Sequence, residues 1–225
     1  MEGRAALYSL GFLMRRAAAV QLDVHERELK VGLRVTQDAN NEVLGQIFIS
    51  DALENGAGYS TYFGENPANA EGLLRFVVGQ DNGAFFGPLV APPHAANCHT
   101  SCPDCLRDFS NLSYHNILDW RLGLDLARLA LDPLAPIDFA VPYWQGIAAA
   151  AAGPYFGARP GWTRTIYADI EAGRRGHQVE IISHPLWDTD INNLCPAATA
   201  AYRAAAAAGA SVTFKSIFEV LRRPF

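Results

Sequence analysis

Three of the four cysteines in the chain, Cys98, Cys102 and Cys105, lie within one short stretch with the spacing C-x3-C-x2-C. Closely spaced cysteines can supply two or three ligands to one tetrahedral zinc ion from a single turn. Pro103 fixes a backbone angle inside this turn and stiffens it. The alternative, three ordinary buried thiols that happen to be neighbours, is disfavoured by their clustering. The spacing therefore predicts a zinc knuckle over residues 98–105.

The fourth ligand is less constrained by the sequence, and three residues compete for it. Cys195 precedes Pro196 at the expected start of an alanine-rich helix, where the helix dipole favours a thiolate. His99 and His115 are alternatives, because imidazole also binds zinc. We predict Cys195, which would make the site closed and structural and would join distant parts of the chain. The complete predicted ligand set is Cys98, Cys102, Cys105 and Cys195.

The pattern of apolar residues predicts a mixed α/β (α+β) fold with a small mixed sheet flanked by helices. Half of the 225 residues are hydrophobic, enough to bury a sizeable core. We expect one zinc-stabilised domain over residues 1–225, with a Gly- and Pro-rich loop at 79–97 that delivers the cysteines. Helices are predicted at 4–20 and 117–131, and strands at 29–35, 43–50, 165–171 and 177–183, the last two flanking a turn at 173–176.

Charge and targeting signals indicate a cytoplasmic protein whose overall charge does not favour nucleic acid. The formal net charge is −5, whereas a protein that mainly grips phosphates is usually basic. The N-terminal stretch lacks the features of a secretory signal, and no apolar run approaches the length of a membrane span. Local DNA contact is still a hypothesis for a few cations: Arg107, Arg121, Arg174 and Arg175.

Motifs for catalysis are incomplete in this sequence. The glycines of 56–58 lack the Lys-Ser/Thr that completes a phosphate-binding loop, so ATP hydrolysis by that mechanism is not expected. There is also no Gly-x-Ser-x-Gly nucleophile elbow. Asp169 and Glu171 alternate on a predicted strand and, with His184, could form a metal-dependent nuclease site, but the expected Lys is absent. The sequence therefore favours a non-enzyme.

From Cys98 to Arg128 the sequence closely resembles the zinc-binding C-terminal domain of MrfA-type DEAD/DEAH-box helicases. The same domain occurs in DrmB, the helicase-partner protein of DISARM antiphage systems. The stretches 27–33, 47–59 and 184–187 also look like this family. The resemblance implies a four-cysteine zinc site onto which Cys98, Cys102 and Cys105 carry over directly, and Cys195 less directly. It also implies a module that is attached to an ATP-driven translocase on DNA or works beside one.

This chain contains no helicase motor, which is its main departure from the family. The resemblance therefore implies a freestanding subunit or a C-terminal piece of a helicase. The expected function is that of a non-catalytic, zinc-binding accessory domain in DNA repair or antiphage defence. Its expected partners are a DEAD/DEAH-box helicase and DNA, and no association with a membrane is expected. The alternatives are the metal-dependent nuclease and an adaptor that docks only onto protein.

Overall fold

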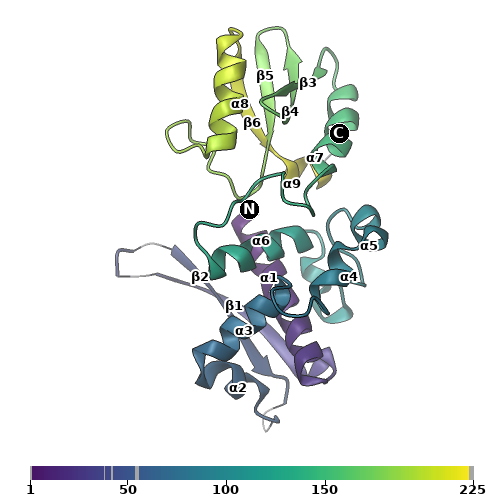
Figure 1. The fold of residues 1–225 in the computed structure, drawn as a ribbon, viewed down its shortest axis with the longest axis vertical. Helices are drawn as coiled ribbons and strands as arrows, with labels where there is room; N and C mark the ends of the chain where they lie inside the picture. Colours follow the sequence, from purple (N-terminus) through teal and green to yellow (C-terminus); the bar gives the residue numbers. More distant parts are fainter. Residues whose placement is uncertain (1, 38, 42, 54–55, 223–225) are drawn as a thin grey trace. The chain divides into compact units, whose positions relative to one another are not determined.

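The computed structural model describes residues 2–37, 39–41, 43–53 and 56–222. Contacts between residues divide the chain into an N-terminal unit, residues 3–135, and a C-terminal unit, residues 136–225 (Figure 1). The mixed α/β class is confirmed, and the single domain over 1–225 stays a prediction. The connecting stretch contains Pro133, Pro136 and Pro142, which interrupt regular structure. Sequence reasoning took Pro133 only as the end of a helix.

The N-terminal unit combines a long β-hairpin with helices. The antiparallel hairpin pairs Leu29 with Asp51 at its base and continues to the pair of Gln37 and Val43. The sequence prediction of two paired strands here is confirmed. The elements in order are α1 (Glu2–Leu22), η1 (Glu26–Glu28), β1 (Leu29–Gln37), β2 (Val43–Asp51), α2 (Tyr59–Glu65), α3 (Pro67–Val77), α4 (Phe86–Val90), α5 (Pro92–Asn97), η2 (Phe109–Tyr114) and α6 (Trp120–Leu131).

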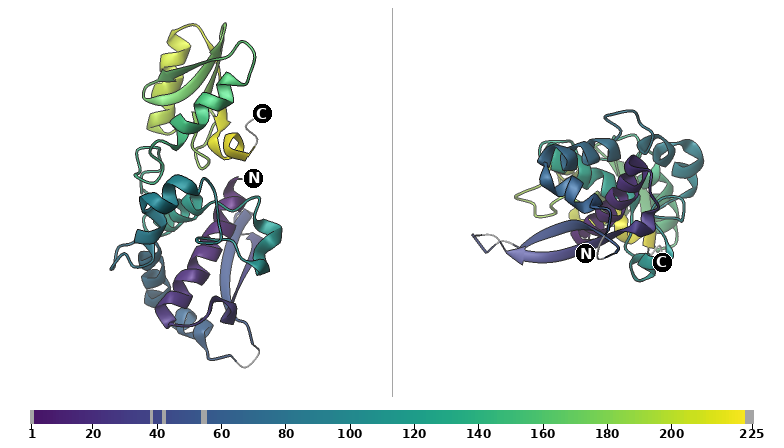
Figure 2. Two further views of the ribbon diagram at one scale, coloured as in Figure 1. Left: turned by 90° about the vertical axis from the view of Figure 1, so that its right-hand side faces the viewer. Right: turned by 90° about the horizontal axis from the view of Figure 1, so that it is seen from below.

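Helix α1 is the central element of this unit, and glycines allow its neighbours to approach closely. A Cβ atom on Gly11 would lie 2.8 Å from a methyl group of Val31 in β1. A Cβ atom on Gly123 of α6 would lie 3.0 Å from the carbonyl carbon of Ser9 in α1. Because neither site can accept a side chain without movement, α1 packs tightly against both elements. Figure 2 shows α1, in purple, running along the hairpin.

Helix α6 confirms the helix predicted at 117–131, with a later start. It begins at Trp120 rather than 117, because the Asp119 carboxylate accepts a hydrogen bond from the Arg121 amide at 3.2 Å and caps the helix. Trp120, Leu122 and Leu124 are fully buried, as a helix with apolar residues over most of its surface requires. The N-terminal end of this helix packs against the cysteine stretch.

The stretch 79–97, predicted to be a loop, contains helices α4 and α5 instead. Pro92 occupies the first turn of α5, where a proline starts a helix rather than breaking one. The Gly and Pro content of this region was therefore misread as loop composition. The correction matters for function, because α5 leads directly into Cys98.

The C-terminal unit is built on a mixed sheet with the strand order β3-β4-β5-β6. Strands β3, β4 and β5 are antiparallel, whereas β6 pairs in parallel with β5 after a crossover through α8. The alternation of side chains gives the sheet two covered faces: Ala172 and Ile181 face the core beneath α8, and Gly173 lies against Phe156 of α7. The elements are α7 (Ile147–Gly157), β3 (Thr163–Tyr167), β4 (Ile170–Arg175), β5 (Gln178–Ser183), α8 (Pro196–Ala207), β6 (Ser211–Ser216) and α9 (Ile217–Arg222).

The predicted turn at 173–176 lies two residues too early. Strand β4 continues to Arg175, and only Gly176 and His177 connect it to β5. Gly176 has a φ of 59°, which glycine adopts without strain. The earlier strand, predicted at 165–171, is divided by a turn at Ala168 and Asp169, whose φ values of 46° and 65° a pattern of apolar residues does not reveal.

Candidate metal centre

Four potential metal ligands converge at the junction between α5 and the cysteine stretch. The nitrogen or sulfur atoms of His94, Cys98, Cys102 and Cys105 all lie within 4.8 Å of one another. Among the residues that the structure describes, no other group of three or more His, Cys, Asp or Glu residues gathers in this way. The predicted cysteine cluster is therefore brought together, with a histidine as its fourth member.

Three distances within this group match those of tetrahedral coordination. The sulfur of Cys105 lies 3.7 Å from the sulfurs of both Cys98 and Cys102. Four sulfur ligands about 2.3 Å from a central zinc ion are about 3.8 Å apart at the corners of a tetrahedron. The Nε2 atom of His94 lies 3.4 Å from the Cys102 sulfur, as expected for a nitrogen, whose bond to zinc is shorter. The donor set and its spacing thus fit a tetrahedral ion of this size.

His94 is oriented for metal binding by a second hydrogen bond. Its Nδ1 atom lies 2.6 Å from the carbonyl oxygen of Leu89 in α4. A carbonyl oxygen can only accept, so Nδ1 carries the proton and Nε2 presents its lone pair to the thiols. Histidine ligands commonly have such a partner, which fixes both the tautomer and the direction of the ring.

Sequence reasoning missed His94 although its spacing was visible. The full pattern is H-x3-C-x3-C-x2-C, from His94 to Cys105. The four-residue step from His94 to Cys98 places both on one side of a helical turn, but only if α5 is recognised as a helix. The prediction of a loop over 79–97 removed that clue.

The backbone of the knuckle is folded around the Cys102 carbonyl and the Cys105 sulfur. The Cys102 oxygen accepts hydrogen bonds from the amides of Cys105, Leu106 and Arg107, at 3.2, 3.1 and 3.0 Å. In return the Cys102 amide donates to the Cys105 sulfur at 3.1 Å. An amide that donates to sulfur stabilises the thiolate form, which is the form that binds metal. These hydrogen bonds therefore fix the shape of the turn that carries the candidate ligands.

Helix α6 holds this stretch from below through two fully buried side chains. The indole of Trp120 donates to the Cys98 carbonyl at 3.1 Å. The guanidinium of Arg121 donates to the carbonyl oxygens of Cys98, His99 and Ala95 at 3.0, 3.1 and 3.0 Å. It also lies 4.2 Å from the centre of the Trp120 ring. These contacts connect the end of α5 and the first cysteine to the core of the unit.

Helix α1 contributes a further arginine from the other direction. Arg16 donates to the carbonyl oxygens of Cys105 and Pro103 at 2.9 and 3.2 Å. Three cysteine thiolates and a neutral histidine around a divalent zinc ion carry a net charge of −1. The guanidinium groups of Arg16 and Arg121 therefore place positive charge near a centre that would otherwise be negative in a partly buried position.

The three thiols differ in acidity because they share hydrogen bonds. The hydrogen bond from Cys98, helped by the Cys102 amide, lowers the pKa of Cys105 to about 5. The same bond and burial raise the pKa of Cys98. Burial and the neighbouring Cys105 raise the pKa of Cys102. These interactions thus favour the thiolate form at Cys105 and the protonated form at Cys98 and Cys102.

His94 replaces Cys195 as the fourth candidate ligand. Cys195 lies in the C-terminal unit at the start of α8, as predicted, but its side chain packs against the apolar core beneath that helix. Four ligands are already supplied by residues 94–105. The two histidine alternatives are also outside the group: the ring of His115 bonds to Asn111, and His99 contributes its carbonyl oxygen to Arg121.

The predicted DNA-contacting arginines lie in three different settings. Arg121 is fully buried, so the hypothesis that it contacts DNA is wrong. Its guanidinium instead binds backbone carbonyl oxygens of the cysteine stretch. Arg107 is partly buried in the N-terminal unit and donates to the Ser101 hydroxyl at 2.9 Å. Arg174 and Arg175 lie at the end of β4 in the C-terminal unit. The structure thus leaves Arg107, Arg174 and Arg175 as surface candidates.

The residues of the nuclease alternative do not form a metal-binding group among the described residues. Glu171 pairs with Arg164 at 2.5 Å across β3 and β4. His184 is buried and packs edge-on against Trp144, with 4.8 Å between ring centres. Asp169 lies in the exposed turn before β4. The three side chains therefore lie in different surroundings and do not form one site.

Comparison with known proteins gives one informative similarity. The chain is 32% identical over 135 residues to the Druantia protein DruE of Escherichia coli (strain UMEA 4076-1). The match covers 58% of this chain but only 6% of that much longer protein. No family model matches the sequence. No solved structure matches it either.

The helices were also compared with the requirements for crossing a bilayer. In the part of the chain that the structure describes, none combines the length and the apolar character that a membrane span needs.

Proposed function

We propose that this chain is a non-catalytic, zinc-binding accessory module that works beside an ATP-driven helicase in defence against phage. The observation that carries the proposal is the convergence of one histidine and three cysteines at tetrahedral spacing. Sulfur and imidazole ligands in this geometry suit zinc better than the oxygen-preferring Mg²⁺ or Ca²⁺. The metal would stabilise the fold of the N-terminal unit.

A structural role for the ion follows from the number of ligands. Four protein side chains complete a tetrahedron, whereas a catalytic zinc keeps one position for water or substrate. The hydrogen bonds that Leu89, Trp120 and Arg121 make with this stretch hold His94 and the backbone of Cys98 in position. Metal binding would therefore contribute mainly to folding free energy.

The association with a helicase and with phage defence is supported from two directions. The stretch from Cys98 to Arg128 resembles the zinc-binding domain of MrfA-type helicases and of an antiphage partner protein. Independently, part of the chain is similar to a Druantia protein of far greater length. Under this proposal, ATP hydrolysis is supplied by the helicase with which the module works.

Metal analysis of the purified chain tests the first half of the proposal. We expect one zinc per chain, lost in Cys102→Ser and retained in Cys195→Ser, which removes a cysteine outside the group. A wild-type protein that contains no zinc and gains no stability from it would contradict the metal assignment. Equal loss of metal in both variants would contradict the ligand set.

Phage plating tests the second half. Cells that carry the chain with its neighbouring genes should resist phage, and Cys102→Ser should abolish that resistance while Cys195→Ser preserves it. ATPase activity of a helicase purified with the chain should also depend on the intact centre. Unchanged resistance in Cys102→Ser cells, with the metal lost, would separate the centre from the defence function and refute the proposal as stated.

A further inference from the structure

The turn between β4 and β5 carries two adjacent arginines whose charges have no carboxylate partner within the described residues. The Nε atom of Arg174 donates to the Gly176 carbonyl oxygen at 2.9 Å. Arg175 donates to the side-chain amide oxygen of Gln178 from Nε and from one terminal nitrogen, at 3.2 and 2.8 Å. Both acceptors are uncharged, so the two positive charges are not neutralised locally.

Three other cations of the C-terminal unit are paired with carboxylates. Arg159 forms an ion pair with Glu180, Arg164 pairs with Glu171, and Lys215 pairs with Glu219. These pairs are consistent with a structural role for the cations involved. The two arginines at the β4–β5 turn are instead left available for an external anion.

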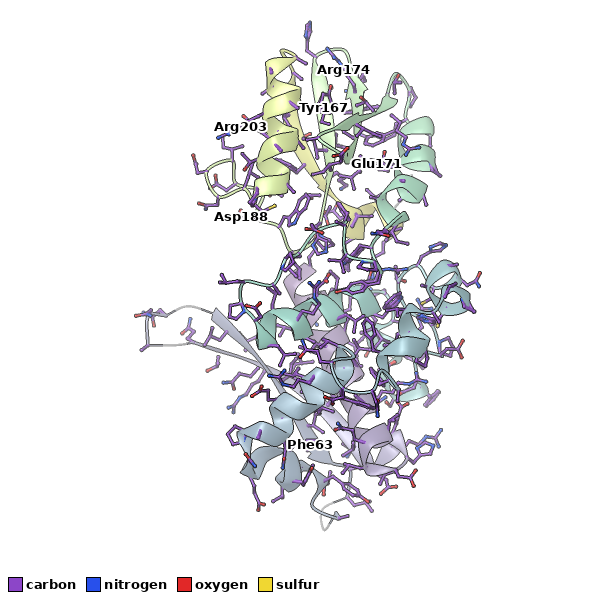
Figure 3. All side chains as sticks on the ribbon, viewed as in Figure 1. Phe63, Tyr167, Glu171, Arg174, Asp188 and Arg203 are labelled. Atoms are coloured by element: carbon purple, nitrogen blue, oxygen red, sulfur yellow. The ribbon has the colours of Figure 1, made fainter. Side chains whose placement is uncertain are left out.

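The acidic residues that flank the turn in sequence, Glu171 and Glu180, are paired with Arg164 and Arg159. Thr163 lies opposite Arg174 on β3, and Ser211 lies beside Gln178 on β6. The segment 172–179 contains no acidic residue. Figure 3 shows Arg174 near one end of the C-terminal unit and Asp188 near the other. Two adjacent positive charges without a carboxylate partner among the described residues therefore lie where β4 meets β5.

The directions of the two side chains determine which kind of anion fits. Neighbouring residues of a strand point to opposite faces. The Arg175 guanidinium lies over the Trp162 ring at 5.2 Å, on the face covered by α7, so Arg174 projects from the other face. A small anion cannot bridge two diverging guanidiniums. An extended chain of phosphates can contact both, since planar guanidinium groups bind phosphate through paired hydrogen bonds.

We propose that Arg174 and Arg175, at the β4–β5 turn, bind the phosphate backbone of single-stranded DNA without reading its sequence. This inference rests on the proposed association with a DNA helicase, whose action exposes single strands. The ring of Trp162, which also contacts Phe156 and Arg159, holds Arg175 in place. The negative charge of the whole chain limits the affinity and makes the contact local.

Binding of fluorescent oligothymidylate to the full chain, measured by anisotropy at several salt concentrations, tests this inference. Each phosphate contact contributes about 0.7 to the slope of log affinity against log salt for single strands. Arg174→Gln and Arg175→Gln should each lower the slope by about 0.7, and the double variant should weaken binding at least about tenfold at low salt. Arg203→Gln, which removes one exposed charge from α8, is the matched control and should change neither value.

The outcomes separate this inference from the proposed function. The double variant should keep its metal, because both side chains lie in the C-terminal unit, away from His94 and the cysteines in sequence. Unchanged affinity in the double variant, or an equal loss in Arg203→Gln, overturns the DNA site and leaves the metal proposal standing. Equally tight binding of polyglutamate, lost in the same variants, overturns the assignment to DNA in favour of an acidic polypeptide.

Discussion

Replacing Arg121 by Met should weaken both the fold and the metal centre, although Arg121 is not a ligand. The guanidinium donates to the carbonyl oxygens of Ala95, Cys98 and His99, and it is fully buried. Methionine fills similar space but leaves these oxygens without that donor. A buried polar group that loses its partner costs about 1–3 kcal/mol.

The summed cost for the three carbonyl oxygens should lie near the low end of this range for each of them. The Cys98 oxygen keeps its hydrogen bond from the Trp120 indole, and burying the guanidinium is itself costly. We therefore expect a loss of about 3–5 kcal/mol in the free energy of unfolding. The melting temperature should fall by on the order of 10 °C for a chain of this size. Metal affinity should fall by about 10- to 100-fold, as is typical when a group that orients a ligand is removed.

Arg107→Met is the matched control for this experiment. It removes an arginine from the same stretch, but one that donates to the hydroxyl of Ser101 at a partly buried position. Denaturant unfolding and competition with a chelator of known affinity measure the two effects. If Arg121→Met loses no more stability or metal affinity than Arg107→Met, the view that α6 orients the centre through the backbone of Cys98 is wrong.

Four further results are expected. His94→Ala should lower metal affinity by at least about tenfold, measured by chelator competition, whereas His99→Ala should leave it unchanged. Cys195→Ser should not alter metal content, which elemental analysis can establish. Gly123→Ala should cost about 1–3 kcal/mol in a urea titration, since its new methyl group meets the backbone of α1. Metal binding near neutral pH should release about two protons, detectable by calorimetry in different buffers, because the raised pKa values of Cys98 and Cys102 keep both thiols protonated in the metal-free protein. Lower pH should accordingly weaken binding.

The local parts of the candidate site were predictable from sequence, and its completion was not. The short spacing from Cys98 to Cys105 forces the thiols together whatever the surrounding fold. The choice of the fourth ligand depended on whether residues 92–97 form a helix, and two prolines with small residues give no periodic pattern there. Cys195 looked suitable because its own surroundings, a proline and a helix start, were read correctly. The sequence did not reveal that His94, rather than Cys195, lies next to the three cysteines.

The same contrast applies to the fold. The alternation in 29–35 and the apolar stripes of α6 predicted their elements, because one period dominates each. The division into two units depends on contacts between distant residues, for which a single sequence has no direct signal. The turn at Ala168 and Asp169 likewise lacks glycine, so its positive φ values could not be anticipated.

The position of all four ligands between His94 and Cys105 has a consequence for how the protein is made. A ribosome releases the whole metal-binding segment well before residues 136–225 have been synthesised, so an ion can be captured while the C-terminal unit is still absent. Metal loading therefore does not require the second sheet, because none of the four candidate ligands belongs to it. If the metal is zinc, as proposed, a shortage of zinc would first affect the N-terminal unit, because all four candidate ligands belong to it.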